Sequence, residues 1–397
     1  RTQDNTTSGG SSDTAGGSHG GVGGEPSRSV SATYGDMTEP SLPGAGGGAL
    51  GDLDTGGNGG GTIRIQVTGA LSYAGTIAAD GQPGAGMAGG GAGGSIWLEA
   101  PDCSGTGQIS ANGGSGGAGG APTGGGGGGR VALDAPNATI TGTITAAGGT
   151  GGNSGPAGQD GTVYYPYGIT WSGLGDEVLW SDTANWNPPV QPNAWNSVFL
   201  TLEEGIQAAL DIDAQVAGLQ IGGDTGTQTL TISQSSLTLG GNGDVGENGV
   251  LIVDGGTIDG VGVIANDGAI TLRDNTAIEL VADNRGSISV SSGAVAHLNG
   301  GLTTGDQSSL VIAGGDTQLY IAGDFSNRGQ LRIEATEPGD ASLYLESGVL
   351  TNLATGAIET QGTYDARMVS ELHNAGSINV RTTTTIGADG AQHTNTG

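Results

Sequence analysis

Short runs in which apolar and polar residues alternate recur along the chain, and they predict β-strands rather than helices. Between the N-terminus and Gly168, one such run follows a Gly-Gly pair at Ile63, Ile96 and Val131, and a degenerate copy with a single glycine occurs at Val163; the spacing between copies is nearly constant. A second run follows the first at a nearly constant offset, at Ile77, Ile109 and Ile144. Each copy of this repeat therefore predicts two β-strands.

Glycine-rich stretches such as 89–94 and 113–129 separate these strand pairs and are too long for tight turns. They could be flexible linkers. Alternatively, they pack as extended polyglycine-like helices, because glycine has no side chain to keep neighbouring backbones apart. Since the flanking strands recur in register, the sequence favours ordered packing.

A different repeat occupies the chain from about position 248 onward. Its marker is Asn-x-Gly followed by an alternating strand, and clear copies contain Asn266 and Gly268, Asn284 and Gly286, Asn327 and Gly329, and Asn374 and Gly376. Degenerate copies occur at Asn248-Gly249 and at 352–356, and one copy is skipped between Asn284 and Asn327. Most successive markers are separated by about 20 residues, which is the length of one turn of a parallel β-helix.

This spacing gives each marker residue an expected role. Asn and Gly tolerate the left-handed backbone of a corner, and Ile, Leu and Val alternate into the core. Stacked Asn side chains can form a hydrogen-bonded ladder along the axis. The only tract to consider as a helix is 202–210.

The chain therefore divides into a polar N-terminal tail at 1–44, a glycine-rich repeat domain at 45–168, a Trp-rich junction at 169–205, and a parallel β-helix at 206–397. The fold class is all-β, and both repeat regions are solenoid-like. The polar composition of residues 1 to about 30 predicts disorder, or else strand donation to a neighbouring molecule. The chain ends within a further marker, so we expect the last repeat to be incomplete.

Composition and charge limit the partners. Gly supplies 86 residues and Phe 2, which favours stacked short strands over a large aromatic core. The formal net charge of −29, with ten basic residues, excludes nucleic acid and direct insertion into acidic membranes. The single cysteine, Cys103, rules out an intrachain disulfide and is interpreted as a small residue at a strand end, with an intermolecular disulfide as the alternative.

Four of the five tryptophans lie close together, at Trp171, Trp180, Trp186 and Trp195. The simpler interpretation is a local aromatic core at the junction of the two repeat systems. The alternative is a carbohydrate-binding site, because an exposed indole ring can stack on a sugar.

The sequence contains no catalytic motif, so we do not expect an enzyme. The histidines share no metal-ligand spacing and are interpreted as solvated residues: His19, His297, His373 and His393. Calcium is a candidate ligand at Asp52, Asp54 and Asp244, in Gly- and Asp-rich stretches; no other cofactor is expected. A charged face could belong to a polysaccharide-cleaving site or, more simply, to a salt-bridge ladder, and it comprises Asp267, Arg273, Asp274, Asp283, Arg285 and Arg328.

The chain resembles large secreted bacterial exoproteins. The glycine-rich unit at 93–98, continued at 107–113 and closed at 128–133, is similar to glycine-rich repeats of bacterial surface proteins. The segment from Trp180 to Trp186, followed by Asn-x-Gly turns, is similar to autotransporter and haemagglutinin-type β-helices. This resemblance implies a role in adhesion, a matrix or a filament.

We therefore expect an extracellular or cell-surface structural or adhesive fibre segment that self-assembles into a homopolymer or contacts a cell or matrix surface. The alternative is a protein that binds or cleaves polysaccharide through its β-helix.

Overall fold

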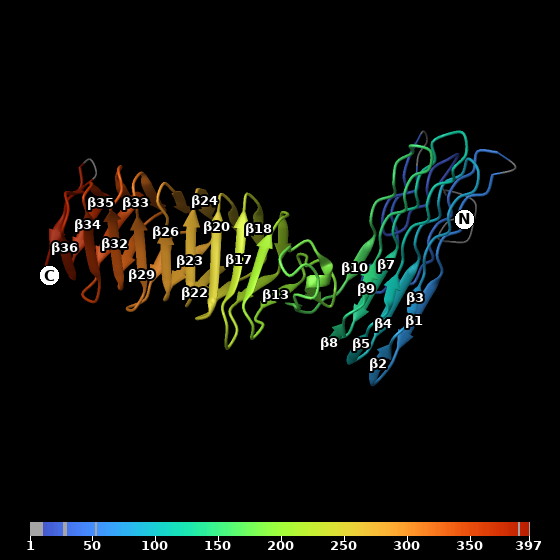
Figure 1. The fold of residues 1–397 in the computed structure, drawn as a ribbon, viewed down its shortest axis with the longest axis horizontal. Helices are drawn as coiled ribbons and strands as arrows, with labels where there is room; N and C mark the ends of the chain where they lie inside the picture. Colours follow the sequence, from blue (N-terminus) through green and yellow to red (C-terminus); the bar gives the residue numbers. More distant parts are fainter. Residues whose placement is uncertain (1–10, 27–29, 52–53, 388–389, 397) are drawn as a thin grey trace. The chain divides into compact units, whose positions relative to one another are not determined.

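The computed structural model describes residues 11–26, 30–51, 54–387 and 390–396 and is all-β. Two compact units form: the N-terminal unit runs to Tyr167 and includes Asn187–Val190, and the C-terminal unit comprises Gly168–Trp186 and Gln191–Gly397 (Figure 1). The division after Tyr167 falls where the glycine content drops. The only helix among the described residues is a 3-10 turn, η1 (Thr183–Asn185).

The N-terminal unit is a parallel solenoid in which every strand pairs with its counterpart one repeat away. Its first sheet has the order β1-β4-β7-β10, and Ile63, Ile96, Val131 and Val163 share one register position. Two three-stranded sheets, β2-β5-β8 and β3-β6-β9, complete it. The strands are β1 (Thr62–Gln66), β2 (Ala70–Tyr73), β3 (Thr76–Ala78), β4 (Ser95–Glu99), β5 (Asp102–Gly105), β6 (Gln108–Ser110), β7 (Arg130–Asp134), β8 (Asn137–Ile140), β9 (Thr143–Thr145) and β10 (Thr162–Tyr164).

Each full repeat of this unit has three strands, so the expectation of two was wrong. The middle strand was missed because it carries little apolar pattern: β5 reads Asp-Cys-Ser-Gly and β8 reads Asn-Ala-Thr-Ile. Cys103 lies within β5 and is buried, and this burial raises the pKa of its thiol. An intermolecular disulfide would need that thiol at the surface, so the structure does not support one.

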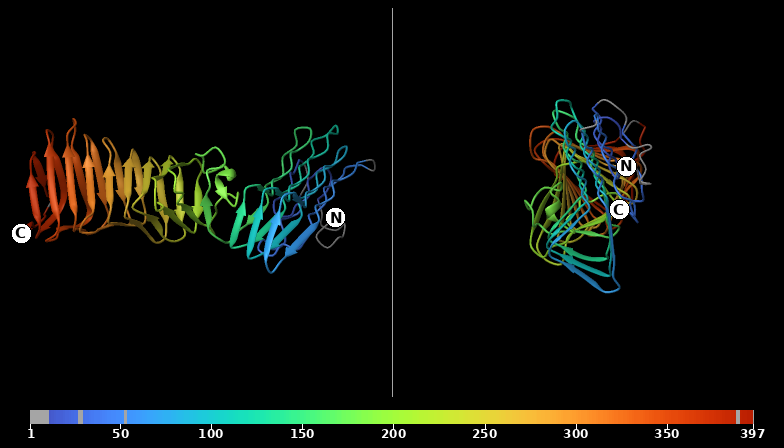
Figure 2. Two further views of the ribbon diagram at one scale, coloured as in Figure 1. Left: turned by 60° about the horizontal axis from the view of Figure 1, so that its bottom comes forward. Right: turned by 90° about the vertical axis from the view of Figure 1, so that its right-hand side faces the viewer.

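The glycine-rich stretches form an ordered layer, which confirms the prediction of packed chains and rules against flexible linkers. Their backbones bond to one another across long sequence distances: Gly126 N–H donates to Gly114 O at 2.8 Å, and Gly90 N–H donates to Gly124 O at 3.0 Å. A Cβ on Gly126 would lie 2.0 Å from Gly91 O. Only glycine therefore permits this spacing. We call these chains the glycine layer, and Figure 2 shows their extended course beside the strands of the same unit.

The described part of the N-terminal tail belongs to this layer. Gly17 N–H donates to Gly90 O at 2.9 Å, and Gly21 N–H donates to Gly128 O at 2.9 Å. Disorder and donation to a neighbouring molecule were thus wrong predictions for residues 11–26; residues 1–10 lie outside the described residues. The polar composition misled because backbone hydrogen bonds, rather than buried side chains, hold the tail.

The C-terminal unit is the expected parallel β-helix, and its strands stack along the unit in Figures 1 and 2. Three strands make a typical turn. The first face is a nine-stranded sheet of β14 (Ile206–Leu210), β17 (Gln228–Ser233), β20 (Gly249–Asp254), β23 (Ala269–Arg273), β26 (Ser287–Val290), β29 (Ser309–Ala313), β32 (Gln330–Ala335), β34 (Ala357–Gly362) and β36 (Ser377–Val380).

The other two faces join in one 19-stranded sheet. The second face contains β15 (Ala214–Val216), β18 (Ser236–Leu239), β21 (Thr257–Gly260), β24 (Asn275–Ile278), β27 (Val295–Leu298), β30 (Thr317–Ile321) and β37 (Thr384–Ile386). The third contains β16 (Gly218–Ile221), β19 (Gly243–Val245), β22 (Val263–Asn266), β25 (Val281–Asn284), β28 (Leu302–Thr304), β31 (Phe325–Asn327) and β38 (Thr394–Asn395). Spanning both faces are β33 (Ala341–Asn352) and β35 (Ala366–Asn374), and the sheet begins with β11 (Ile169–Trp171), β12 (Trp186–Asn187) and β13 (Ser197–Leu200).

Alternation of buried and solvent-facing residues fills the interior of each turn. From β17 to β34, one register column of the first face is apolar and at most 1% exposed: Leu230, Leu251, Ile270, Ile288, Leu310, Leu331 and Ile358. Each such side chain contributes about 1.5–3 kcal/mol through burial. The tract 202–210, considered as a helix, instead contains β14 because its apolar residues face this core.

The asparagine ladder is confirmed at the corner between the third and first faces. Asn266 Nδ2 donates to Asn284 Oδ1 at 2.7 Å, and Asn352 Nδ2 donates to Asn374 Oδ1 at 2.7 Å. Thr304 occupies the position of the skipped copy. Asn248 is not a rung of the ladder, because Val245 is the residue in register with Asn266.

The marker glycines are needed for a different reason from the one expected. No marker Asn or Gly has a positive φ, although all of them lie in the described part of the chain. Instead, a Cβ on Gly286 would lie 2.2 Å from Gly268 O, and one on Gly376 would lie 2.2 Å from Gly356 O. Close stacking of successive turns therefore selects glycine at this corner. The left-handed backbone occurs at other corners, such as Gly262 with φ 102°.

Candidate functional site

Three of the four clustered tryptophans form a buried core within the C-terminal unit. Trp171, Trp180 and Trp186 are 1%, 0% and 1% exposed, and the ring of Trp186 packs edge-to-face against the other two at centroid distances of 4.8 and 4.7 Å. Because all three rings are buried, none of them can stack on a sugar as an exposed indole does, and that role is wrong for these three. Trp195 is 54% exposed.

A polar hub beside this core holds the loop 173–179 in place. Asn185 is fully buried, and its Oδ1 accepts hydrogen bonds from the N–H groups of Gly175 and Glu177, both at 3.0 Å. Its Nδ2 donates to Asp176 Oδ1 at 2.8 Å. Backbone N–H groups of Leu179 and Val178, together with this amide, hold the pKa of Asp176 below its ordinary value. The hub fixes the loop through hydrogen bonds at nearly every step.

Glu177 lies in the left-handed backbone region, with φ 66°. This conformation strains a residue that has a Cβ, by about 1–3 kcal/mol, and such strain concentrates at functional sites. The hydrogen bond from Glu177 N–H to the buried Asn185 amide compensates for it locally. The glutamate side chain is exposed.

The loop and the chain at 202–207 enclose a pocket of about 330 Å³, which we call the Trp171 pocket. Its lining includes Trp171, Glu177, Val178, Glu204, Ile206 and Gln207. Trp171 Nε1 donates to no other described residue, although the indole is almost wholly buried. The pocket therefore combines an unused N–H donor, two carboxylates, an amide and apolar walls. Sequence reasoning found the tryptophan but missed both glutamates, and only the Asp/Asn-rich stretch 176–185 signalled a structured loop.

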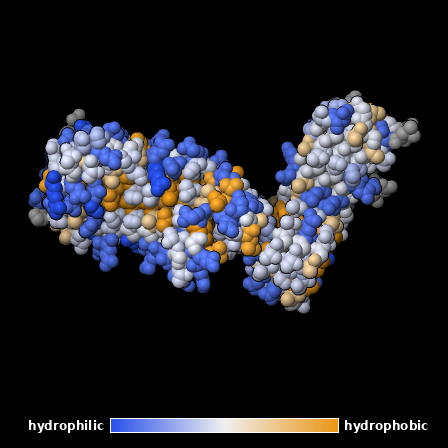
Figure 3. Space-filling view, in the orientation of Figure 1, coloured by the Kyte–Doolittle hydropathy of each residue, from blue (hydrophilic) through white to orange (hydrophobic). Residues whose placement is uncertain are grey.

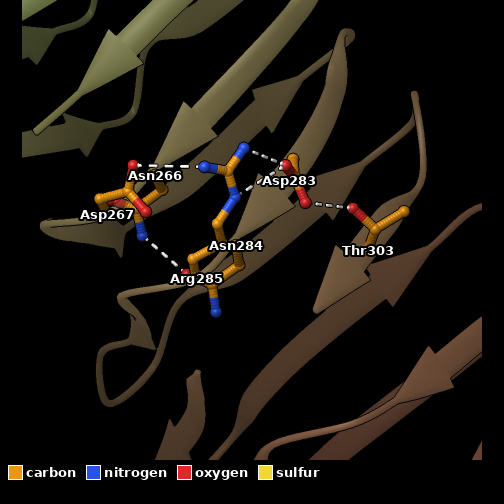
Figure 4. Close-up of polar contacts among 6 residues, drawn as sticks. All are labelled: Asn266, Asp267, Asp283, Asn284, Arg285 and Thr303. Atoms are coloured by element: carbon orange, nitrogen blue, oxygen red, sulfur yellow. Dashed lines mark hydrogen bonds and ion pairs between the residues drawn. The ribbon is translucent and has the colours of Figure 1, made fainter. Parts of the chain in front are cut away.

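The charged face considered for catalysis contains an ion-pair network instead (Figure 4). Arg285 lies 2.8 Å from Asp283 Oδ2 and 3.6 Å from Asp267 Oδ2, and Thr303 Oγ1 donates to Asp283 Oδ1 at 2.7 Å. Hydrogen bonds from Arg285 and Thr303 lower the pKa of Asp283, and the partner carboxylates raise the pKa of Arg285. A general acid at neutral pH needs a raised carboxyl pKa, so this arrangement favours the salt-bridge ladder. Among the residues that the structure describes, Arg273, Asp274 and Arg328 make no ion pair with this network.

The calcium candidates do not come together. Asp52 lies outside the described residues, Asp54 Oδ1 accepts from Met87 N–H at 2.9 Å, and Asp244 stands exposed on β19 between Gln220 and Ala265. Within the described ranges, no group of three or more His, Cys, Asp or Glu side chains could hold a metal.

One histidine contradicts the expectation of solvated residues. His19 is fully buried in the N-terminal unit, where its Nδ1 lies 2.9 Å from Gly93 O and its Nε2 has no hydrogen-bond partner among the described residues. Burial lowers the pKa of His19 to about 4. His297 is half-buried and stacks on Tyr320 at 4.8 Å; His373 lies 2.8 Å from Glu371, and His393 accepts from Leu372 N–H.

The fold and these sites place the chain among all-β proteins built as parallel solenoids. No family model, curated protein or solved structure matches it. In the part of the chain that the structure describes, no helix is long and apolar enough to cross a membrane.

Proposed function

We propose that the chain is an extracellular structural or adhesive segment, related in role to secreted bacterial exoproteins with glycine-rich and autotransporter- or haemagglutinin-like repeats. The observation that supports this most is the continuous apolar column from Leu230 to Ile358, which joins successive turns while leaving every second side chain outside. A solenoid of this kind adds outer surface with each turn at constant width. Such a surface suits contact with a matrix, a cell or another copy.

The outer surface of the C-terminal unit is varied rather than uniformly apolar. On the face seen in Figure 3, apolar patches lie between polar ones. Stacked rings of His297, Tyr320 and Tyr344 run along the second face, with centroids 4.8 and 4.7 Å apart. Because these ring faces cover each other, they support the stacking of turns rather than sugar binding.

A non-catalytic role is part of this proposal. Asp283 of the charged face has a lowered pKa and is paired with Arg285. Self-assembly through the N-terminal tail loses its support for residues 11–26, because their backbone groups bond within the same chain. Homopolymer formation would therefore use other surfaces.

An adhesion assay, in which protein-coated beads are held on a surface against a flow of buffer, tests the proposal. Beads coated with the full chain should adhere to surfaces bearing extracellular matrix, and beads coated with an acidic globular protein of similar net charge should not. Sedimentation velocity over a wide concentration range would detect self-association in parallel. A chain that neither adheres nor associates would contradict the proposal.

Polysaccharide binding is the second candidate function, and the Trp171 pocket favours it. The pocket lies at the lower end of the range of about 300–1,000 Å³ found for ligand sites, and it has few but well-placed polar groups.

A further inference from the structure

We propose that the Trp171 pocket binds one neutral sugar ring of a glycan. This inference rests on the adhesive form of the proposed function and names the chemistry of the target. Trp171 lines the pocket with an indole that is 1% exposed. Its Nε1 is not among the buried side-chain atoms that lack a partner, so it reaches solvent and is open to an acceptor. A sugar hydroxyl or ring oxygen supplies one.

The remaining lining complements the rest of such a ring. Carboxylates of Glu177 and Glu204 accept hydrogen bonds from hydroxyl groups, and charge-assisted bonds of this kind are about twice as strong as neutral ones. The Gln207 amide both donates and accepts. Val178 and Ile206 offer apolar surface to the C–H groups of the ring. Its volume of about 330 Å³ suits one ring rather than a long stretch of polymer.

Charge selects among the possible ligands. The lining includes two glutamates and no basic residue, so uronates, sulfated sugars and phosphates are repelled. A cationic side chain or amino sugar would suit the carboxylates but would face the Trp171 N–H and the apolar walls. A neutral hexose satisfies both the donor and the acceptors.

The strained Glu177 backbone is consistent with selection for binding rather than for stability. Glycine at this position would relieve the strain at φ 66°. The chain instead carries a glutamate there and holds it with the Asn185 hub. Stability and affinity should therefore respond in opposite directions when this residue is replaced by glycine.

Titration of the full chain with cellohexaose, maltohexaose, a glucosamine hexamer and an oligogalacturonate, followed by calorimetry and saturation-transfer NMR, tests the inference. A neutral hexasaccharide should bind, with little dependence on salt. Glu204→Gln and Trp171→Phe should each weaken binding about tenfold, which corresponds to the loss of one strong hydrogen bond. Glu203→Gln is the matched control, because Glu203 is the adjacent exposed glutamate outside the pocket lining.

Glu177→Gly should weaken binding by a similar factor while raising the unfolding temperature, which separates a binding role from misfolding. Failure of both neutral hexasaccharides to bind the folded chain would overturn the inference, as would equal binding by the Glu203→Gln and Glu204→Gln variants. Salt-sensitive binding of the glucosamine hexamer alone would also overturn it and indicate a cation site. If beads adhere but pocket variants adhere equally well, this inference fails and the proposed function stands.

Discussion

Adding one methyl group to the glycine layer should disrupt it, and Gly126→Ala is the sharpest such change. The new Cβ would lie 2.0 Å from Gly91 O, well short of ordinary van der Waals contact, which begins at 3.4 Å. Both atoms belong to backbone that is hydrogen-bonded on several sides. The neighbouring chain must therefore move, because no side chain can rotate away.

Three hydrogen bonds set the size of the effect. Gly126 N–H donates to Gly114 O, Gly149 N–H donates to Gly126 O, and Gly114 N–H donates to Gly91 O, at 2.7 to 2.8 Å. Each contributes about 1 kcal/mol, and overpacking of a close-packed interior adds about 1–3 kcal/mol. We expect Gly126→Ala to lower the local unfolding free energy by about 4 kcal/mol.

Gly120→Ala provides the matched control within the same stretch. Gly120 is exposed, has no atom within 4 Å of its would-be Cβ, and does not require a left-handed backbone. Its replacement should change stability by no more than about 1 kcal/mol. Hydrogen–deuterium exchange of the full chain, read on peptides covering 113–129, measures both variants. Equal protection in the two variants would refute the ordered glycine layer.

Three further outcomes are expected. Asn352→Ala should destabilise the C-terminal unit by about 3 kcal/mol in urea unfolding, because it removes two amide–amide bonds of the ladder; Asn299→Ala, at an exposed residue bonded to Glu279, should cost under about 1 kcal/mol. The N-terminal unit should lose up to about 3 kcal/mol as pH falls from about 6.5 to about 4, because the unfolded chain binds a proton that buried His19 does not; His19→Gln should remove this part of the pH dependence. Arg285→Ala should raise the pKa of Asp283 toward its ordinary value in an NMR titration and leave the unfolding temperature nearly unchanged, because solvent screens this largely exposed pair.

The turns of both solenoids were predictable because side chains mark them. Ile63 and Ile96 pair in the register that their spacing indicates, and Asn266 and Asn284 stack as expected. Apolar residues that must face a core and amides that must find partners leave a periodic signal in one sequence. A strand with few apolar residues, such as β5, carries no such periodic pattern and was not predicted.

The glycine layer was predictable in kind but not in detail. A glycine run has no side-chain pattern, so the sequence does not reveal that 14–24 packs among the later runs. The sequence also did not reveal why the marker glycines are needed. Either a close approach to Gly268 O or a left-handed φ would select glycine at 286, and only the structure distinguishes the two.

The candidate site was the least predictable part. Trp171 was identified, but its buried ring and free N–H depend on packing against Trp186. Glu177 and Glu204 are distant in the sequence and come together only in the folded unit. Acidic residues are common in this chain, so no spacing singled out these two.

We propose that the chain assembles or binds without catalysing a reaction. Electron microscopy of the purified full chain, mixed with a neutral polysaccharide and assayed in the same sample for new reducing ends, tests this most directly. We predict chains associated with each other or decorating the glycan, with reducing ends constant over time. Dispersed monomers accompanied by a steady release of reducing ends would contradict it.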